Sequence, residues 1–241
     1  MIHYSVISKL GNRDINEDSY SCACVDNNAC FVVADGLGGH AKGEVASALV
    51  VDEIQQHLKQ CEVLPDEALK DAIVHAQDAL MAKQRELCVR NDMKTTVVVL
   101  YITGEQLIWG HVGDSRLYAF KKNKIIEQTK DHSIPQMLVL SGDIPAKKIR
   151  NHPQRNLLLR VMGIEWDSPK CELSTVFKQD EFEAFLLCSD GFWELITEKD
   201  MCKTLKRSKS PEEWLQNMVS IVERNGANKE MDNYTAVTIF C

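Results

Sequence analysis

The chain has 241 residues, a length that fits one large domain or two small ones. Apolar residues make up 44% and charged residues 26%, the usual mix for a globular protein with a sizeable core. The net charge is −7 and the basic residues are scattered, which argues against nucleic acid as a partner, because phosphate backbones require clustered Lys and Arg.

The sequence predicts neither a secretory signal peptide nor a membrane-spanning segment. The first residues, MIHYSVISKL, lack a charged segment followed by an apolar run, so we expect no secretory signal peptide. No apolar run reaches the roughly 20 residues of a membrane span. The nine cysteines are irregularly spaced, mostly in apolar surroundings such as LLCSDG. We therefore expect a reduced, cytoplasmic protein with no membrane partner.

Short strands and a few long helices alternate along the chain. Eight segments rich in Val, Ile and aromatic residues are predicted strands: Tyr4–Ser8, Ser19–Val25, Phe31–Ala34, Thr95–Ile102, Gln106–Val112, Leu117–Lys121, Phe185–Cys188 and Tyr234–Cys241. Apolar residues at helical spacing predict helices over Ala46–Leu58 and Leu69–Leu80. A third helix begins at the N-cap Ser210, with Glu213 completing a capping box. Since no repeat or linker divides the chain, we expect one domain, 1–241, of antiparallel sheets covered by helices.

The stretch VVADGLGGHAKGEVAS admits two interpretations. Gly36, Gly38 and Ala41 match the pattern G-x-G-x-x-A of dinucleotide-binding proteins, after a strand and before a helix. However, a second helix follows instead of a parallel strand, so the βαβ unit of that fold is missing. Asp35, directly before the first glycine, would also repel a pyrophosphate unless a cation lay between them.

Other aspartates occupy similar places. Asp114 in GHVGDSR and Asp190 in LLCSDGFWE follow apolar strands, and Asp232 in EMDNYTAV precedes the last one. A single Asp-Gly pair usually only forms a turn. Four aspartates in matching places indicate more, because gathered carboxylates raise each other's pKa unless cations neutralise them. Oxygen ligands favour Mg²⁺ or Mn²⁺ over zinc, so the pattern predicts a site for such an ion.

Eight ordered segments resemble the protein phosphatase 2C family, the metal-dependent serine/threonine protein phosphatases, and DGLGGHAKGE and HPQRN resemble its bacterial branch. The resemblance implies an α+β fold, a four-layer αββα sandwich of two antiparallel sheets packed face to face and flanked by helices. It also implies a flap over about 133–168. The segments are GNRDINEDS, VADGLGGHAKGEVAS, MKTTVVV, GHVGDSRLY, TKDHS, NHPQRNLLLRVMG, LLCSDGFWE and DNYTAV.

The family resemblance implies a site for two Mn²⁺ or Mg²⁺ ions at one end of the sandwich, with a possible weaker third. Its expected ligands are Asp35, which bridges the two ions, the Gly36 carbonyl, Asp190, Asp232 and, through water, Glu17, with Asp18 beside it.

Further site residues follow from the same resemblance. Asp114 would share the third ion with Asp190, helped by Glu194 and Asn156. Arg13 would bind the substrate phosphate, since a guanidinium fork suits two phosphate oxygens. The alternative for Arg13 is a surface ion pair with Asp14 or Asp18.

Two positions depart from the family pattern. Leu37 stands where eukaryotic members carry a histidine thought to protonate the leaving group, and nothing in the sequence places His40 in that role. Lys94 stands where glycine is usual, and we expect its side chain to point outward. The general acid therefore stays open.

The resemblance implies hydrolysis of phosphoserine and phosphothreonine in proteins by a metal-activated water, without a phosphoenzyme. It also implies an opposing serine/threonine kinase as partner, and we expect a monomer. A catalytically silent phosphoprotein-binding module is the alternative, although no acidic ligand is missing. A cysteine phosphatase is disfavoured, because Cys202 and Arg207 have four residues between them instead of five.

Overall fold

Two antiparallel β-sheets lie face to face in the computed structural model, which describes residues 2–25, 28–37, 42–59, 65–89 and 92–241. One sheet has the strand order β1 (His3–Lys9), β12 (Tyr234–Phe240), β11 (Ala184–Cys188), β7 (Arg116–Lys121) and β8 (Lys124–Gln128). The other has the order β10 (Phe177–Lys178), β6 (Gln106–Val112), β5 (Val97–Thr103), β3 (Asn28–Leu37) and β2 (Asp18–Val25), with β4 (Lys94–Thr95) beside β3 and β9 (Glu172–Leu173) beside β6.

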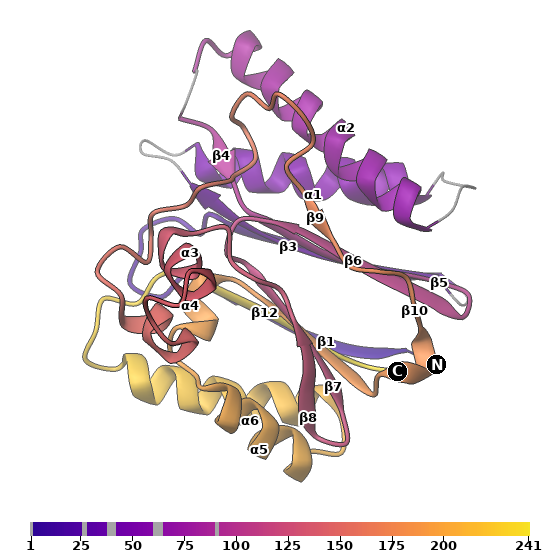
Figure 1. Cartoon of the computed structure of the whole chain (residues 1–241), viewed down its shortest axis with the longest axis vertical. Helices are drawn as coiled ribbons and strands as arrows, with labels where there is room; N and C mark the ends of the chain where they lie inside the picture. Colours follow the sequence, from indigo (N-terminus) through magenta and orange to yellow (C-terminus); the bar gives the residue numbers. More distant parts are fainter. Residues whose placement is uncertain (1, 26–27, 38–41, 60–64, 90–91) are drawn as a thin grey trace.

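Helices cover the outer face of each sheet, which gives four layers (Figure 1). The pair α1 (Gly43–Lys59) and α2 (Pro65–Glu86) covers the sheet that contains β3, and α5 (Glu198–Arg207) and α6 (Pro211–Gly226) cover the sheet that contains β12. Shorter elements are α3 (Ile134–Leu140), α4 (Asp190–Trp193), η1 (Ala146–Asn151) and η2 (Gln179–Glu181). The predicted αββα sandwich is confirmed. Among the described residues, no helix combines the length and apolarity needed to cross a bilayer.

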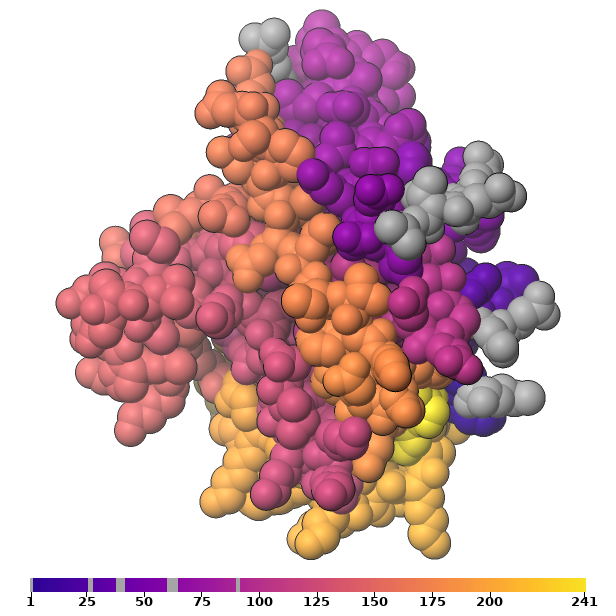
Figure 2. Space-filling model, turned by 45° about the vertical axis from the view of Figure 1, so that its right-hand side comes forward, coloured from indigo at the N-terminus to yellow at the C-terminus, as the bar shows by residue number. Residues whose placement is uncertain are grey.

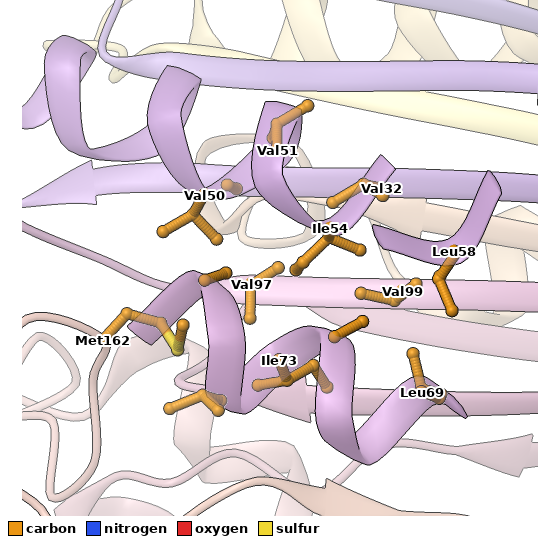
Figure 3. Packing of buried hydrophobic residues seen from close by; sticks show 14 of the residues in the cluster. Val32, Val50, Val51, Ile54, Leu58, Leu69, Ile73, Val97, Val99 and Met162 are labelled. Carbon is orange, nitrogen blue, oxygen red and sulfur yellow. The ribbon is translucent and has the colours of Figure 1, made fainter. Parts of the chain in front are cut away.

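Apolar side chains fill the three interfaces between these layers. Figure 3 shows part of the first, where Val50 and Ile54 of α1 and Ile73 of α2 pack on Val97 and Val99 of β5. Separate clusters lie between the two sheets and between the sheet that contains β12 and the helices α5 and α6. The helical faces predicted from apolar spacing are therefore the buried faces.

Some elements differ from the sequence-based expectation. The strand predicted over Thr95–Ile102 is interrupted at Thr96, whose N–H donates to the Asp35 carbonyl instead of joining a regular ladder. The edge strand β8 was missed, because its exposed sequence KIIEQ lacks the alternation of a half-buried strand. In α6, Ser210 accepts from the Glu213 N–H as predicted, but the Glu213 carboxylate accepts from Lys209, one residue before the expected position.

The flap contains the helix α3 and the 3₁₀ helix η1, neither of which was predicted. Ser133 caps α3, and the Ile134 N–H donates to the Leu157 carbonyl at 3.0 Å, so the segment 134–157 of the flap is closed at its base. Figure 2 shows this part of the chain, in salmon, projecting from the side of the molecule.

Candidate active site

Five carboxylates and one arginine converge on a cavity of about 220 Å³ at one end of the sandwich. They come from the loop before β2, the ends of β3 and β6, the start of α4 and the start of β12. The lining is Arg13, Glu17, Asp35, Gly36, Leu37, Asp114, Asn156, Leu158, Asp190, Asp232 and Asn233. The structure therefore brings the predicted residues together, except that Asp18 and Glu194 lie outside this lining.

The backbone around Asp35 is fixed by the two threonines of the segment MKTTVVV. The Asp35 carbonyl accepts from Thr95 Oγ1 and from the Thr96 N–H, both at 2.8 Å. The Asp35 N–H donates to Thr96 Oγ1 at 3.0 Å. These bonds use only the main chain of Asp35, so its carboxylate is left free to face the cavity.

The same region distinguishes between the dinucleotide-binding and the metal-binding interpretation of the glycine-rich stretch. A Cβ on Gly36 would lie 2.3 Å from the Gly43 carbonyl oxygen, so Gly36 lets the start of α1 approach the end of β3. The chain continues from α1 to α2 and then to an antiparallel strand, which excludes the βαβ unit of a dinucleotide-binding fold. Gly38, His40 and Ala41 lie outside the described residues.

Asn233 holds the loop that carries Arg13 and Glu17, a role that was not predicted. Its Nδ2 donates to the carbonyls of Leu10 at 2.8 Å and Ile15 at 3.0 Å, and its Oδ1 accepts from the Glu17 N–H at 2.9 Å. In the sequence, the feature that could have indicated this role is that a polar residue directly follows Asp232. Asn233 therefore joins the N-terminal loop to the start of β12.

Arg13 forms an ion pair with Asp232 at 2.7 Å, not with Asp14 or Asp18, and its side chain is 61% exposed. Hydrogen bonding to Asp232 is the main factor that raises the pKa of Arg13, and the charges of Glu17 and Asp190 add to it. Arg13 thus lies at the mouth of the carboxylate cavity, where it can meet an anion from solvent.

Behind Glu17 lies a second carboxylate that was not predicted, Glu44 of α1. Burial raises the pKa of Glu17, and the charge of Glu44 raises it further. Asp18 lies outside the cavity lining and accepts from Ser189 Oγ at 2.7 Å. Asp18 Oδ1 and Glu44 Oε2 are buried without a hydrogen-bond partner among the described residues.

The carboxylates strongly disfavour one another's charge. Burial raises the pKa of Asp35 well above its ordinary value, and Asp190 is the largest charge that adds to it. Burial, followed by the charge of Glu194, raises the pKa of Asp190 to about 7. The pKa of Asp114 is raised in the same way, by burial and then by Asp190. Such a site needs positive charge to hold its carboxylates ionised.

Divalent cations fit this arrangement. The atoms of the cavity lining that could bind a cation are carboxylate, amide and carbonyl oxygens, and the carboxylates of Asp35, Asp114 and Asp190 are buried among like charges. Oxygen-rich sites of this kind favour Mg²⁺ or Mn²⁺. The donor set and its uncompensated charge therefore agree with the predicted metal site.

The residues expected at a third ion are only partly together. Asp114 and Asn156 line the small cavity with Asp190. Glu194 instead forms a short ion pair with Arg155 of the flap and lines a larger neighbouring cavity of about 940 Å³. Leu37, at the position where a histidine was expected only in eukaryotic relatives, does line the small cavity. Lys94 is half-buried opposite Leu37, so its side chain is less free than expected.

Another group of possible metal ligands lies outside this lining. One potential ligand atom from each of His111, His132 and Glu172 lies within 4.8 Å of the others. However, the Gly113 N–H donates to His132 Nδ1 at 3.1 Å, which leaves the proton on Nε2, 3.3 Å from Glu172. A metal would require that nitrogen without its proton, and Arg160 lies 3.4 Å from it. The geometry favours hydrogen-bonded neutral histidines, and burial accordingly lowers the pKa of His132 to about 4.

Comparisons with known proteins identify the family of the chain. The family model Protein phosphatase 2C matches residues 8–234. A serine/threonine phosphatase of Listeria welshimeri is 32% identical over 89% of this chain and 85% of its own length. The phosphatase PstP of Mycobacterium tuberculosis is 32% identical over 98% of this chain, which spans 44% of that protein.

Solved structures give the same result. Serine/threonine phosphatase Stp1 from Staphylococcus aureus superposes with a TM-score of 0.89 at 27% identity, covering 100% of this chain and 95% of that one. The catalytic domain of a phosphatase PstP, in complex with two manganese ions, has a TM-score of 0.81 at 26% identity, with 99% and 97% covered. The chain therefore belongs to the protein phosphatase 2C family and is a protein serine/threonine phosphatase of the bacterial type.

Proposed function

We propose that the carboxylate cavity holds two divalent ions, Mn²⁺ or Mg²⁺, and that the chain uses them to hydrolyse phosphoserine and phosphothreonine in proteins. The observation that carries this proposal is the convergence of five carboxylates in one small cavity with Arg13 at its mouth. The related PstP structure with two manganese ions supports the choice of ion and number. The opposing partner would be a protein serine/threonine kinase.

The position of each residue in the cavity indicates whether it would bind the ions or the phosphate. When bound, the ions supply an activated water and neutralise phosphoryl oxygens, so no protein nucleophile is required. Asp35, Asp190 and Asp232 would hold the ions, with the Gly36 carbonyl beside them, and Glu17 would bind through water. Arg13 would leave Asp232 and bind the phosphate, because a bidentate guanidinium contact stabilises the oxygens of a transferring phosphoryl group.

Two further residues of the cavity lining, Asp114 and Leu37, bear on the third ion and on the general acid. Asp114 would hold a weaker third ion with Asp190, and Asn156 lies beside both in the cavity lining. Leu37 offers no proton to the leaving group, so the acid would be a water near Asp114. The complete set of carboxylates argues against the silent phosphoprotein-binding alternative.

Removal of metal tests the proposal directly. Hydrolysis of a phosphothreonine peptide and of p-nitrophenyl phosphate should require Mn²⁺ or Mg²⁺, vanish in EDTA and return with excess Mn²⁺, because the carboxylates alone repel a phosphate. Calorimetric titration of the stripped protein with Mn²⁺ should show two tight sites. Turnover by exhaustively stripped enzyme would disprove the mechanism, and a single tight site would disprove the ion count.

Arg13→Ala should raise KM for a phosphothreonine peptide while Mn²⁺ binding persists. Loss of a charged contact to the phosphate should lower kcat/KM roughly tenfold to hundredfold. Arg224→Ala, an arginine in the last turn of α6, is the matched control and should behave as wild type. An unchanged kcat/KM for Arg13→Ala would restrict Arg13 to its ion pair with Asp232.

A further inference from the structure

Arg150, near the end of η1 in the flap, makes a set of contacts that metal and phosphate binding do not require. Its Nε donates to the Trp193 carbonyl at 3.0 Å, and its Nη2 donates to the Ile196 carbonyl at 2.9 Å. Nη2 also donates to Glu198 Oε1 at 2.9 Å, and the side chain is only 17% exposed. One flap arginine therefore binds three successive parts of the chain from α4 to α5.

These acceptors suit a guanidinium and no other side chain. Trp193 is the last residue of α4, and carbonyls at the end of a helix have no partner within it. A planar fork of donors can reach several such acceptors at once, whereas the ammonium of a lysine is a single point of charge. Although burial raises the pKa of Glu198, the hydrogen bond and charge of Arg150 bring it below its ordinary value, which keeps this partner ionised.

The helix α4 is itself part of the active site and has contacts from outside the flap that hold it there. It begins at Asp190, one of the proposed metal ligands. Trp193 Nε1 donates to the Asp114 carbonyl at 3.0 Å, and the Arg116 guanidinium lies 3.4 Å from the centre of the Trp193 ring. Arg150 thus ties the flap to a fixed element of the site.

The flap forms one wall of the larger cavity, and that wall continues from Arg150. The two cavities share Arg13, Asn156, Asp190 and Asp232, so the larger one opens directly from the proposed phosphate site. Arg150 and the residues that follow it line this cavity: Asn151, His152, Pro153, Arg155 and Asn156. Arg155 forms a second ion pair between the flap and the α4 region, with Glu194, but the Arg155 side chain is 39% exposed and so more open to solvent than that of Arg150.

We propose that Arg150 is a positioning residue that holds the flap wall against α4 and thereby sets the affinity of the enzyme for phosphorylated polypeptides. This inference rests on the proposed function. A phosphopeptide extends from the phosphate site into the larger cavity and needs the wall in place. The small substrate p-nitrophenyl phosphate needs little beyond the carboxylate cavity and Arg13.

The test compares two substrates in Arg150→Gln and Arg150→Lys, with Lys148→Gln as the control from an exposed position of the same 3₁₀ helix. At saturating Mn²⁺, KM for a phosphothreonine peptide should rise about tenfold in both Arg150 variants, since charged hydrogen bonds are lost. Their kcat on the peptide, and kcat/KM on p-nitrophenyl phosphate, should stay within about twofold of wild type. Lys148→Gln should match wild type on both substrates.

Hydrogen exchange of the wild type and Arg150→Gln provides a readout that does not depend on turnover. Amides of 146–152 should exchange faster in the variant, while those of α1 stay unchanged. An unchanged peptide KM, an equal loss on both substrates or full activity of Arg150→Lys would each overturn the positioning role. Absence of metal-dependent turnover in the wild type would overturn the proposed function instead, and hydrogen exchange would still decide whether Arg150 anchors the flap.

Discussion

Asp35→Asn should abolish turnover while leaving the protein folded. The change removes one negative charge from the centre of the carboxylate cavity and keeps the shape of the side chain. Metal activation of water contributes several kcal/mol to catalysis, so its loss should lower kcat by on the order of 10³-fold or more. The measurement is kcat on a phosphothreonine peptide at saturating Mn²⁺, together with Mn²⁺ binding by calorimetry.

The fold should survive this substitution, because Thr95 and Thr96 bind only the main chain of Asp35. The metal-free variant should even unfold at a higher temperature than the metal-free wild type, because Asp35 is buried among like charges. Asp78→Asn, an exposed aspartate of α2, is the matched control and should leave both quantities unchanged. Near-normal turnover with two tightly bound ions would exclude Asp35 as a metal ligand.

The strand-end aspartates could be predicted because each follows or precedes a strand whose apolar run is easy to recognise. Asp35, Asp114 and Asp190 come directly after such runs, and the structure places all three around one cavity. In an antiparallel sheet the end of one strand lies beside the start of its neighbour, as Asp190 after β11 lies beside Asp232 before β12. Two strands that flank a third, such as β3 and β6 beside β5, end at the same edge, which brings Asp35 and Asp114 together. The antiparallel arrangement itself followed from short strands and short connections.

Contacts between distant segments could not be predicted in this way. Arg13 and Asp232 are 219 positions apart in the sequence. Nothing in the sequence around Arg13 indicates that it pairs with Asp232 and not with the nearby Asp14 or Asp18. Glu44 was missed for a related reason, since an acidic residue in the first turn of a helix usually only favours the helix dipole. One Glu44 oxygen is buried without a hydrogen-bond partner among the described residues, and this follows only from the packing of α1 against the Glu17 loop.

The contacts of the flap could not be predicted from the sequence either, because they also join distant segments. Its wall is held by Arg150 and Arg155, and both partners lie in the segment from α4 to α5. A local reading of PAKKIRNHPQRN gives a basic, polar loop, which is the usual composition of a solvated surface segment. Only the tertiary structure shows that its arginines bind a helix-end carbonyl and half-buried carboxylates.

The metal-free protein should become less stable as pH rises from 5 to 8, opposite to the usual behaviour of paired carboxylates. Burial and like charges raise the folded-state pKa of Asp190 to about 7, and burial raises that of Asp18 to about 6. An unfolded aspartate has a pKa of about 3.9. Between these values the aspartates bind more protons in the folded state than in the unfolded state, so the free energy of unfolding falls as pH increases. This fall exceeds the opposite effect of His132, whose pKa burial lowers to about 4 and which acts only below the unfolded histidine pKa of about 6.5.

The melting temperature in EDTA should therefore be lower at pH 8 than at pH 5 by about 5 °C or more, since 1 kcal/mol shifts Tm by roughly 2–4 °C at this size. Excess Mn²⁺ should remove most of the difference, because bound cations favour the ionised carboxylates at every pH in the range. Asp190→Asn should flatten the dependence in EDTA, whereas the exposed control Asp78→Asn should retain it. A melting temperature that rises with pH in EDTA, or a slope that Asp190→Asn leaves unchanged, would show that the gathered carboxylates do not destabilise the metal-free fold.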